Sequence, residues 1–298
     1  MSPPRWLPLA RQEARIVLTS KGPWILAVLL VAYAYRPTNI AAANLGANIS
    51  AAFIQDVGTF LLPLGVLLLS YRSIIRERTS GSLKFLLGLP LTRGDILAGK
   101  ILGRSAGIAL PVCAAIVVVV GIGAIRFGSP SPLLFIGLTL VTVIYTLLLV
   151  TVATSASAAS NSTVRVTGVL FGGFYLFVTV LWKPVVTRIY GATVSPLDPY
   201  NAPADGLLFM LLRLSPERSY RLLTNWLLDV GNSGAAYRSV LIKLEPGSSI
   251  NAYVVETAFG STPAPLYLHE VGGIVLLTVW FVAAAAIGYA VFNRSDLA

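Results

Sequence analysis

Long apolar runs alternate with short polar segments along most of the chain. A membrane-spanning helix needs roughly 20 mostly apolar residues. The pattern predicts six such helices, at about 16–35, 56–71, 105–125, 133–153, 164–182 and 271–292. The first is the weakest, because its uninterrupted run, PWILAVLLVAYAY, is 13 residues long. It spans only if the helix begins near Ile16 and the Lys21 side chain reaches back to the interface.

The segment 183–270 interrupts this pattern and predicts a small extracytoplasmic insertion. Its apolar stretch 206–214 is too short to span, so we expect it to dip into the outer interface. Ser215, Pro216 and Gly231 are typical of the cap, first turn and end of a helix. The stretches RSVLIKL and NAYVVETAF are typical of strands.

Composition agrees with a membrane protein. Of the 298 residues, 56% are hydrophobic and 11% charged, and the mean hydropathy is +0.79, whereas soluble domains carry about 25% charged residues. The net charge of +10 does not indicate a nucleic-acid partner, because the basic residues lie between apolar runs without interleaved aromatic residues. The single cysteine, Cys113, excludes disulfides within the chain and Cys-based metal sites.

The distribution of lysine and arginine predicts the orientation. With the N-terminus inside, the short outer loops hold only Arg36 and Arg126. The inner segments then hold Arg5, Arg11, Arg15, Lys21, seven basic residues within 71–104, Arg165 and Arg294. Because short cytoplasmic loops are enriched in Lys and Arg, we expect a multi-pass protein of the plasma membrane with both termini cytoplasmic. The N-terminal WLPLARQEARIVL predicts a helix in the inner interface, or alternatively a solvated lead-in.

The densest charge cluster surrounds a short amphipathic stretch between the second and third predicted spans. Thr79 or Ser80 can cap a helix through SGSLKFLLGL, and Gly88 with Pro90 can end it. Leu83, Leu86 and Leu87 share one face of this helix, and Thr92 with Asp95 predicts a capping box for the next one. A helix this short cannot cross a bilayer. It is either a lipid-surface helix or a docking element for a soluble partner.

Other candidate sites are less specific. His269 and Glu270 are too few ligands for a metal site, so no metal is expected and an interfacial pair is favoured. Asp56 opens the second span and is either a cavity-facing or a solvated boundary residue. Gly168 and Gly172 form a GxxxG pattern for helix packing, within the bundle or between subunits, and Gly99, Gly103 and Gly107 repeat it. No catalytic constellation is present in the sequence.

The charged segment resembles the signature of type-2 ABC exporter permeases. The residues that carry the resemblance are Glu77-Arg78, Gly81-Ser82-Leu83, Leu86-Leu87, Pro90, Arg93 and Gly99-Lys100. The interfacial N-terminal helix, the six spans, the serine-rich SASAASNSTVR and the final FNRSDL agree with it. The resemblance covers nearly the whole chain and is weakest over 183–270.

The resemblance implies an all-α permease with a cytoplasmic coupling helix at about 79–90, which sits in a groove of a separate ABC ATPase subunit. It implies a second permease copy, as a homodimer or with a close paralogue, and a path between the two. In this chain Leu83, Phe85, Leu86 and Leu87 would be the docking residues. Glu77, Arg78, Gly81, Pro90 and Arg93 would flank them.

The chain itself lacks the P-loop chemistry for ATP hydrolysis, because Gly99-Lys100 is followed by Ile101 rather than Ser or Thr. It is therefore expected to bind no cofactor and not to be an enzyme, with ATP and magnesium bound by the partner. The alternatives are an ion-coupled secondary transporter, which would normally place ionisable groups at mid-span, and a membrane assembly factor that transports nothing.

Overall fold

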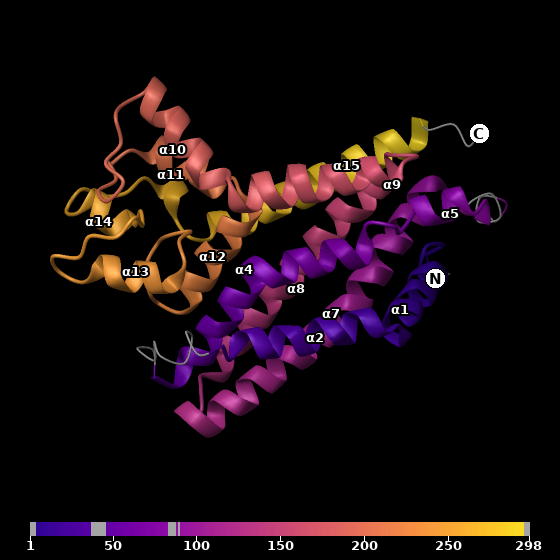
Figure 1. The fold of residues 1–298 in the computed structure, drawn as a ribbon, viewed down its shortest axis with the longest axis horizontal. Coiled ribbons are helices and arrows are strands. Elements are labelled where there is room, and N and C mark those ends of the chain that lie inside the picture. The colour runs from indigo at the N-terminus through magenta and orange to yellow at the C-terminus, as the bar shows by residue number, and fades with distance from the viewer. Residues whose placement is uncertain (1–3, 37–45, 83–87, 89, 295–298) are drawn as a thin grey trace.

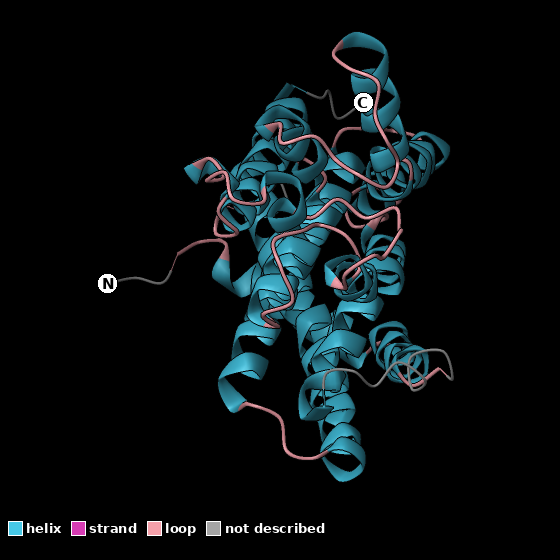
Figure 2. Cartoon of the chain, turned by 90° about the vertical axis from the view of Figure 1, so that its left-hand side faces the viewer, coloured by secondary structure: helices cyan, strands magenta, loops and turns pink. Residues whose placement is uncertain are grey.

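The computed structural model describes residues 4–36, 46–82, 88 and 90–294, and this part of the chain consists of helices and connecting loops (Figures 1 and 2). The first half contains α1 (Leu7–Thr19), α2 (Lys21–Ala34), η1 (Gly46–Asn48), α4 (Ile49–Ser70), α5 (Ile75–Thr79), α7 (Arg93–Phe127) and α8 (Pro132–Ala158). The second half contains α9 (Thr163–Thr167), η2 (Gly168–Val180), α10 (Trp182–Thr193), α11 (Gly206–Arg213), α12 (Pro216–Leu227), α13 (Tyr237–Leu244), α14 (Val255–Phe259), η3 (Leu266–Leu268) and α15 (Gly272–Arg294). The helix η2 is wound as a π-helix.

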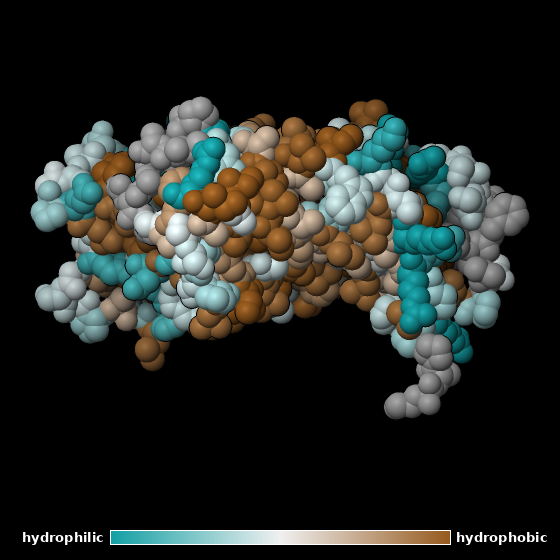
Figure 3. All heavy atoms as spheres, turned by 90° about the horizontal axis from the view of Figure 1, so that it is seen from below, coloured by the Kyte–Doolittle hydropathy of each residue, from teal (hydrophilic) through white to brown (hydrophobic). Residues whose placement is uncertain are grey.

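Five helical segments are long and apolar enough to cross a membrane. They are Gly46–Thr79, Arg93–Phe127, Pro132–Ala158, Thr163–Val180 and Gly272–Arg294. These segments contain the second to sixth predicted spans, apart from the last two residues predicted for the fifth and the first residue predicted for the sixth. A space-filling view shows the apolar residues as a broad band across the middle of the molecule, with polar residues gathered at its two ends (Figure 3). The prediction of an all-helical polytopic membrane protein is therefore confirmed.

The first predicted span, 16–35, is not a single continuous helix in the structure. The chain breaks at Ser20, whose backbone is extended, and α1 and α2 meet there at an angle of 59°. Pro23 favours the break, because in a continuous helix its ring would clash with the Thr19 carbonyl, although Pro63 and Pro111 lie inside α4 and α7 without a break. Helix α2 has 14 residues, roughly 21 Å of helix, so the sixth span exists only if the bent pair counts as one.

The long helices run back and forth between two ends of the molecule. Helices α1, α5 and α9 lie at one end together with the last turn of α15, and α10, α11, α13 and α14 lie at the other (Figure 1). Helix α7 occupies the centre of the first half and contacts α1, α2, α4 and α8, while α15 packs on α8. Helix α1 and the last turn of α15 thus lie at the same end of the molecule; that both termini are cytoplasmic stays a prediction.

The segment 183–270 is not simply a cap on the bundle. Helix α12 lies among the spans and contacts α4, α8 and α15, whereas α11, which covers the apolar stretch 206–214, packs on α10 and α12. Helix α12, rather than α11, is thus the part of this segment that packs among the spans; the expectation that 206–214 dips into the outer interface stays a prediction. The Tyr220 ring of α12 stacks on Tyr145 of α8 with centroids 4.8 Å apart.

A buried glutamine fixes α12 to the second span. The Gln55 side chain of α4 donates to Thr224 Oγ1 and to Asn225 Oδ1, both at 2.7 Å, and accepts from the Tyr237 amide at 2.9 Å. Gln55 is fully buried, so these bonds satisfy groups that would otherwise be costly to remove from water.

The two strand-like stretches are helical or irregular in the structure. RSVLIKL forms most of α13, and NAYVVETAF ends in α14. Tyr237 and Val240, three residues apart, are buried on one face of α13. Burial of this face outweighs the local preference of β-branched residues for strands.

The glycines of the Gly99, Gly103 and Gly107 pattern seat α1 on α7. A Cβ added to Gly103 would lie 2.4 Å from the Ala10 carbonyl oxygen, and one added to Gly107 would lie 2.7 Å from Val17. These three glycines therefore pack against another helix of the same chain, rather than against a second subunit. Helix α1 is held against α7 along its length.

We expect Gly103→Val to detach α1 from α7. Its side chain meets a backbone oxygen that cannot rotate away, so the free energy of unfolding in detergent should fall by about 1–3 kcal/mol. Gly121→Val is the matched control, because a Cβ at Gly121 of the same helix meets nothing within 4 Å. Denaturant titration of both variants, with protease sensitivity of 1–20 as a second readout, measures the difference; equal losses would contradict this seat for α1.

Candidate functional site

The candidate coupling segment begins directly after α4 and is held at its start by α8. The amides of Ile74 and Ile75 donate to Ser157 Oγ at 3.1 and 3.0 Å. Both isoleucine side chains are buried. The short helix α5 is therefore fixed to the end of α8 before the segment of interest begins.

Lys100 of α7 is the centre of a buried ion-pair network. Its ammonium donates to Glu13 Oε1 of α1 and to Glu77 Oε1 of α5, each at 2.6 Å. The Lys100 side chain has no exposed surface, and Glu13 is 5% exposed. One side chain thus joins the interfacial helix, the start of the candidate coupling segment and the third span.

Arg104 completes this network. Its Nε lies 3.1 Å from Glu13 Oε2, and its Nη1 donates to the Leu69 carbonyl at 3.2 Å. Two cations thus face two carboxylates, so the cluster is formally neutral. Removing charges from water is costly unless each has a partner; a shift of α1, α5 or α7 alone would separate these partners. The arrangement therefore couples the positions of the three helices.

Arg78 is engaged inside the chain rather than left for a partner protein. Its guanidinium donates to the carbonyls of Ala158 and Ser160 at 3.1 and 3.2 Å, and to Asn161 Oδ1. It thereby satisfies carbonyl groups at the C-terminal end of α8, where a cation is favourable. The structure assigns Arg78 a contact that the sequence analysis did not anticipate.

Arg93 joins the start of α7 to the end of α15. Its Nη1 donates to the carbonyls of Phe292 and Asn293 at 2.5 and 2.9 Å. The predicted capping box is present beside it: Thr92 Oγ1 accepts from the Asp95 amide at 3.0 Å, and Asp95 Oδ2 accepts from the Thr92 amide at 2.9 Å. The start of α7, which follows the candidate coupling segment, is therefore anchored to the end of α15.

Of the remaining predicted coupling residues, some are described by the structure and others are not. Gly81 has a φ of +77°, which favours glycine, and it follows the end of α5; Pro90 is exposed. The hydroxyls of Thr79 and Ser80 donate to the carbonyls of Arg76 and Glu77 at the end of α5, and most of the helix that they were predicted to cap lies outside the described residues. The predicted docking residues Leu83, Phe85, Leu86 and Leu87 lie outside the described residues.

Sequence reasoning missed Glu13 and gave Lys100 only as part of a motif. The available signal was the spacing of Leu9, Glu13 and Val17, which places one carboxylate on the apolar face of α1. Its cationic partner lies 87 residues later, and no local pattern identifies it.

The other candidate sites form simple pairs. Asp56 is seven residues inside α4 and lies 3.4 Å from Arg36, so it does not open the second span as predicted. His269 Nδ1 lies 3.5 Å from Glu270 Oε2. The described residues contain no group of three or more potential metal ligands.

Gly168 and Gly172 have open surroundings. A Cβ added to either glycine, or to Gly173, would meet no atom of the chain within 4 Å. The GxxxG pattern of η2 therefore does not pack within the bundle, and its alternative role between subunits stays a prediction.

A polar groove of about 340 Å³ lies between α10 and the loops around Leu197 and Asn251, at the end of the molecule away from α1 and α5. Lys183 donates there to Asn251 Oδ1 at 2.6 Å. Burial, with the nearby charges of Arg218 and Arg221, lowers the pKa of Lys183 to about 8. Part of the Lys183 population is therefore neutral near physiological pH.

Comparison with known proteins gives a consistent result over nearly the whole chain. The profile of the family described as ABC-2 family transporter protein matches residues 7–297. A protein of Stutzerimonas stutzeri called probable ABC transporter permease protein NosY is 30% identical over 234 residues, which cover 72% of this chain and 79% of that protein. The protein of the same name from Pseudomonas aeruginosa is 36% identical over 111 residues, which cover 34% of this chain and 39% of that protein.

Proposed function

Because the chain belongs to the ABC-2 family of transporter proteins and is an ABC transporter permease, we propose that it forms the path of an ATP-driven exporter. Two copies would pair, and each would receive the force of a separate ATPase subunit through the segment at about 79–90. This chain would form the path and transmit the effect of ATP hydrolysis. The partner ATPase would bind ATP and magnesium.

The buried network around Lys100 is the observation that carries this proposal. A force applied to the segment after Thr79 reaches Glu77 first, and through Lys100 it reaches α7 and α1. Arg93 provides a second connection, from the start of α7 to the end of α15. Contacts of this kind suit a segment whose displacement must move several spans together.

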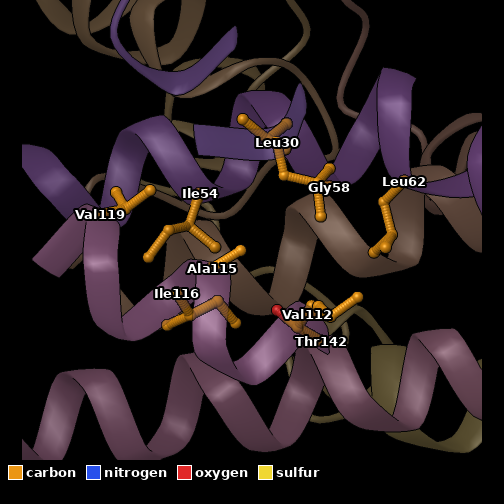
Figure 4. A pocket seen from close by; sticks show the side chains of 10 residues that line it. Leu30, Ile54, Gly58, Leu62, Val112, Ala115, Ile116, Val119 and Thr142 are labelled. Carbon is orange, nitrogen blue, oxygen red and sulfur yellow. The ribbon is translucent and has the colours of Figure 1, made fainter. Parts of the chain in front are cut away.

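The small size of the central pocket within one chain supports a transport path that lies between two copies. A pocket at the centre of the bundle, lined by residues of α2, α4, α7 and α8 that include Leu30, Ile54, Val112 and Thr142, has a volume of about 20 Å³ (Figure 4). Such a volume holds about one water molecule, so this pocket cannot accommodate a transported molecule.

The second copy would pack against α9–η2. Only 17% of the residues in the most apolar stretch of this span are buried, and 11% in that of α15, against 61% for the span that contains α4. The open glycines Gly168 and Gly172 would allow close approach of another helix. The aromatic side chains of Phe60 and Tyr175, whose ring centroids are 6.3 Å apart, would then lie beside the path.

We expect Gly172→Cys to form a disulfide between two copies under oxidising conditions, in a chain whose Cys113 is first changed to alanine. A disulfide needs Cβ atoms about 3.8 Å apart, which the open face of η2 permits. Gly121→Cys is the control, since Gly121 is equally open but lies on α7. Non-reducing gels of membranes measure the dimer. Equal cross-linking in the two variants would contradict η2 as the pairing surface.

The transport function itself is tested by co-expression with the ATPase subunit. Native mass measurement of the purified complex should give two permeases and two ATPases, and ATP turnover should require both chains. An ion-coupled secondary transporter would move its substrate without the ATPase, and an assembly factor would move none. Lys100 and Asp56 each lie within the first eight residues of α7 and α4 rather than at the middle of these helices.

A further inference from the structure

The corner between α1 and α2 forms a groove on the outside of the bundle. The groove has a volume of about 490 Å³ and is lined by residues 18–21 at the corner and by Trp24, Ile25, Val28 and Leu29 along α2. The 59° bend creates it, because the two helices diverge from Ser20. It differs from the central pocket in being open to the surroundings of the molecule.

The opposite faces of the two helices are occupied by the bundle. Helix α1 packs on the glycines of α7, and α2 buries Leu26, Ala27 and Leu30 against its neighbours. The groove face therefore remains apolar and exposed: Val28 is 68% and Ile25 56% exposed. In a membrane protein such a face contacts lipid chains.

The shape of the groove is fixed by a hydrogen bond across the bend. The Trp24 indole nitrogen donates to the Leu18 carbonyl at 2.8 Å. The hydroxyls of Thr19 and Ser20 donate to the carbonyls of Arg15 and Val17 at 2.8 and 2.7 Å. The corner is thus held in place before any ligand binds.

Two cations stand at the corner without an acidic partner. Lys21 begins α2, and Arg15 lies on the same face of α1 as Leu18 and Thr19. Both are exposed, and no acidic side chain in the described part of the chain pairs with either. Glu13, the nearest acid in the sequence, is buried against Lys100 and Arg104.

We propose that this groove binds one anionic phospholipid. Its phosphate and headgroup would lie at Arg15 and Lys21, and an acyl chain would follow Trp24, Ile25, Val28 and Leu29. From Lys21 to Leu29 the helix rises roughly 12 Å, most of the depth of one hydrocarbon leaflet, which is roughly 15 Å. A soluble anion would leave this apolar wall unused, so a lipid fits both parts of the groove.

The test is native mass spectrometry of the full-length chain, purified in detergent and equilibrated with equal amounts of phosphatidylglycerol and phosphatidylcholine. We expect one phosphatidylglycerol to be retained in preference. Each cation near an anionic lipid surface strengthens association roughly fivefold, so Arg15→Gln with Lys21→Gln should reduce the preference roughly thirtyfold. The matched control, Arg72→Gln with Arg76→Gln, removes two exposed cations from the same end of the molecule and should change it less than threefold.

A third variant tests the acyl chain. Val28→Trp fills the groove without changing charge, and its exposed position leaves the bundle intact. It should abolish the retained lipid while Arg15 and Lys21 remain. Retention of the preference in Val28→Trp or in the Arg15 and Lys21 double variant would overturn the proposal, as would equal loss in the Arg72 and Arg76 control.

Discussion

Replacing Lys100 with methionine should lower the free energy of unfolding by about 3–5 kcal/mol. The change removes the ammonium that both Glu13 and Glu77 contact at 2.6 Å. Methionine fills a similar volume, so the loss comes from Glu77 left without its charged partner and from Glu13 left with Arg104 alone, rather than from a cavity. Unfolding by denaturant titration in a neutral detergent measures it.

Two further variants isolate the electrostatic cause. Lys21→Met removes an exposed lysine and should change stability by less than about 0.5 kcal/mol. Adding Glu77→Gln to Lys100→Met removes the carboxylate left unpaired and should recover part of the loss, while Glu13 stays paired with Arg104. If Lys100→Met is no less stable than Lys21→Met, the network does not hold these helices together.

The combined substitution Leu86→Ala and Leu87→Ala should release the ATPase subunit. Apolar anchors at such interfaces contribute about 2 kcal/mol or more each, so the pair predicts roughly thousandfold weaker association. The permease should still insert into the membrane. Co-purification of the ATPase at matched membrane levels, together with ATP turnover, measures the effect.

Leu102→Ala with Leu110→Ala is the matched control, because both of these leucines are exposed on α7. Arg93→Ala should also retain the ATPase far better than the double leucine variant, since Arg93 contacts carbonyls of α15 and exposed polar contacts contribute under about 1 kcal/mol. Full transport by the Leu86 and Leu87 double variant would show that this stretch is only a lipid-surface element.

The spans were predictable because each contains a long apolar run, and no other element satisfies its backbone groups within a bilayer. The first span was not, since its boundary depends on one proline rather than on hydropathy. Pro23 favours a helix that starts at Lys21 over one that passes through Thr19. The capping box at Thr92 and Asp95 was predictable for the opposite reason, because both of its residues lie within one turn.

Contacts between distant segments were largely beyond the sequence. Lys100 meets an acid 87 residues before it, and Gln55 meets α12 169 and 170 residues after it. Arg78 and Arg93 were assigned to a partner protein from the resemblance alone, yet both contact carbonyls of the chain's own helices. The sequence shows that a charged loop residue needs a partner, but it does not show which residue or protein that partner is.

The position of α12 has a consequence for how the protein is made. This helix carries Glu217, Arg218 and Arg221 and has a Pro at its start, so it is a poor candidate for entry into lipid on its own. Its contacts are with α4 and α8, which are synthesised before it, and with α15, which is synthesised after it. We therefore expect α12 to stay outside the bilayer during synthesis and to enter the bundle only once α15 has been inserted, which would make its docking a late step of biogenesis.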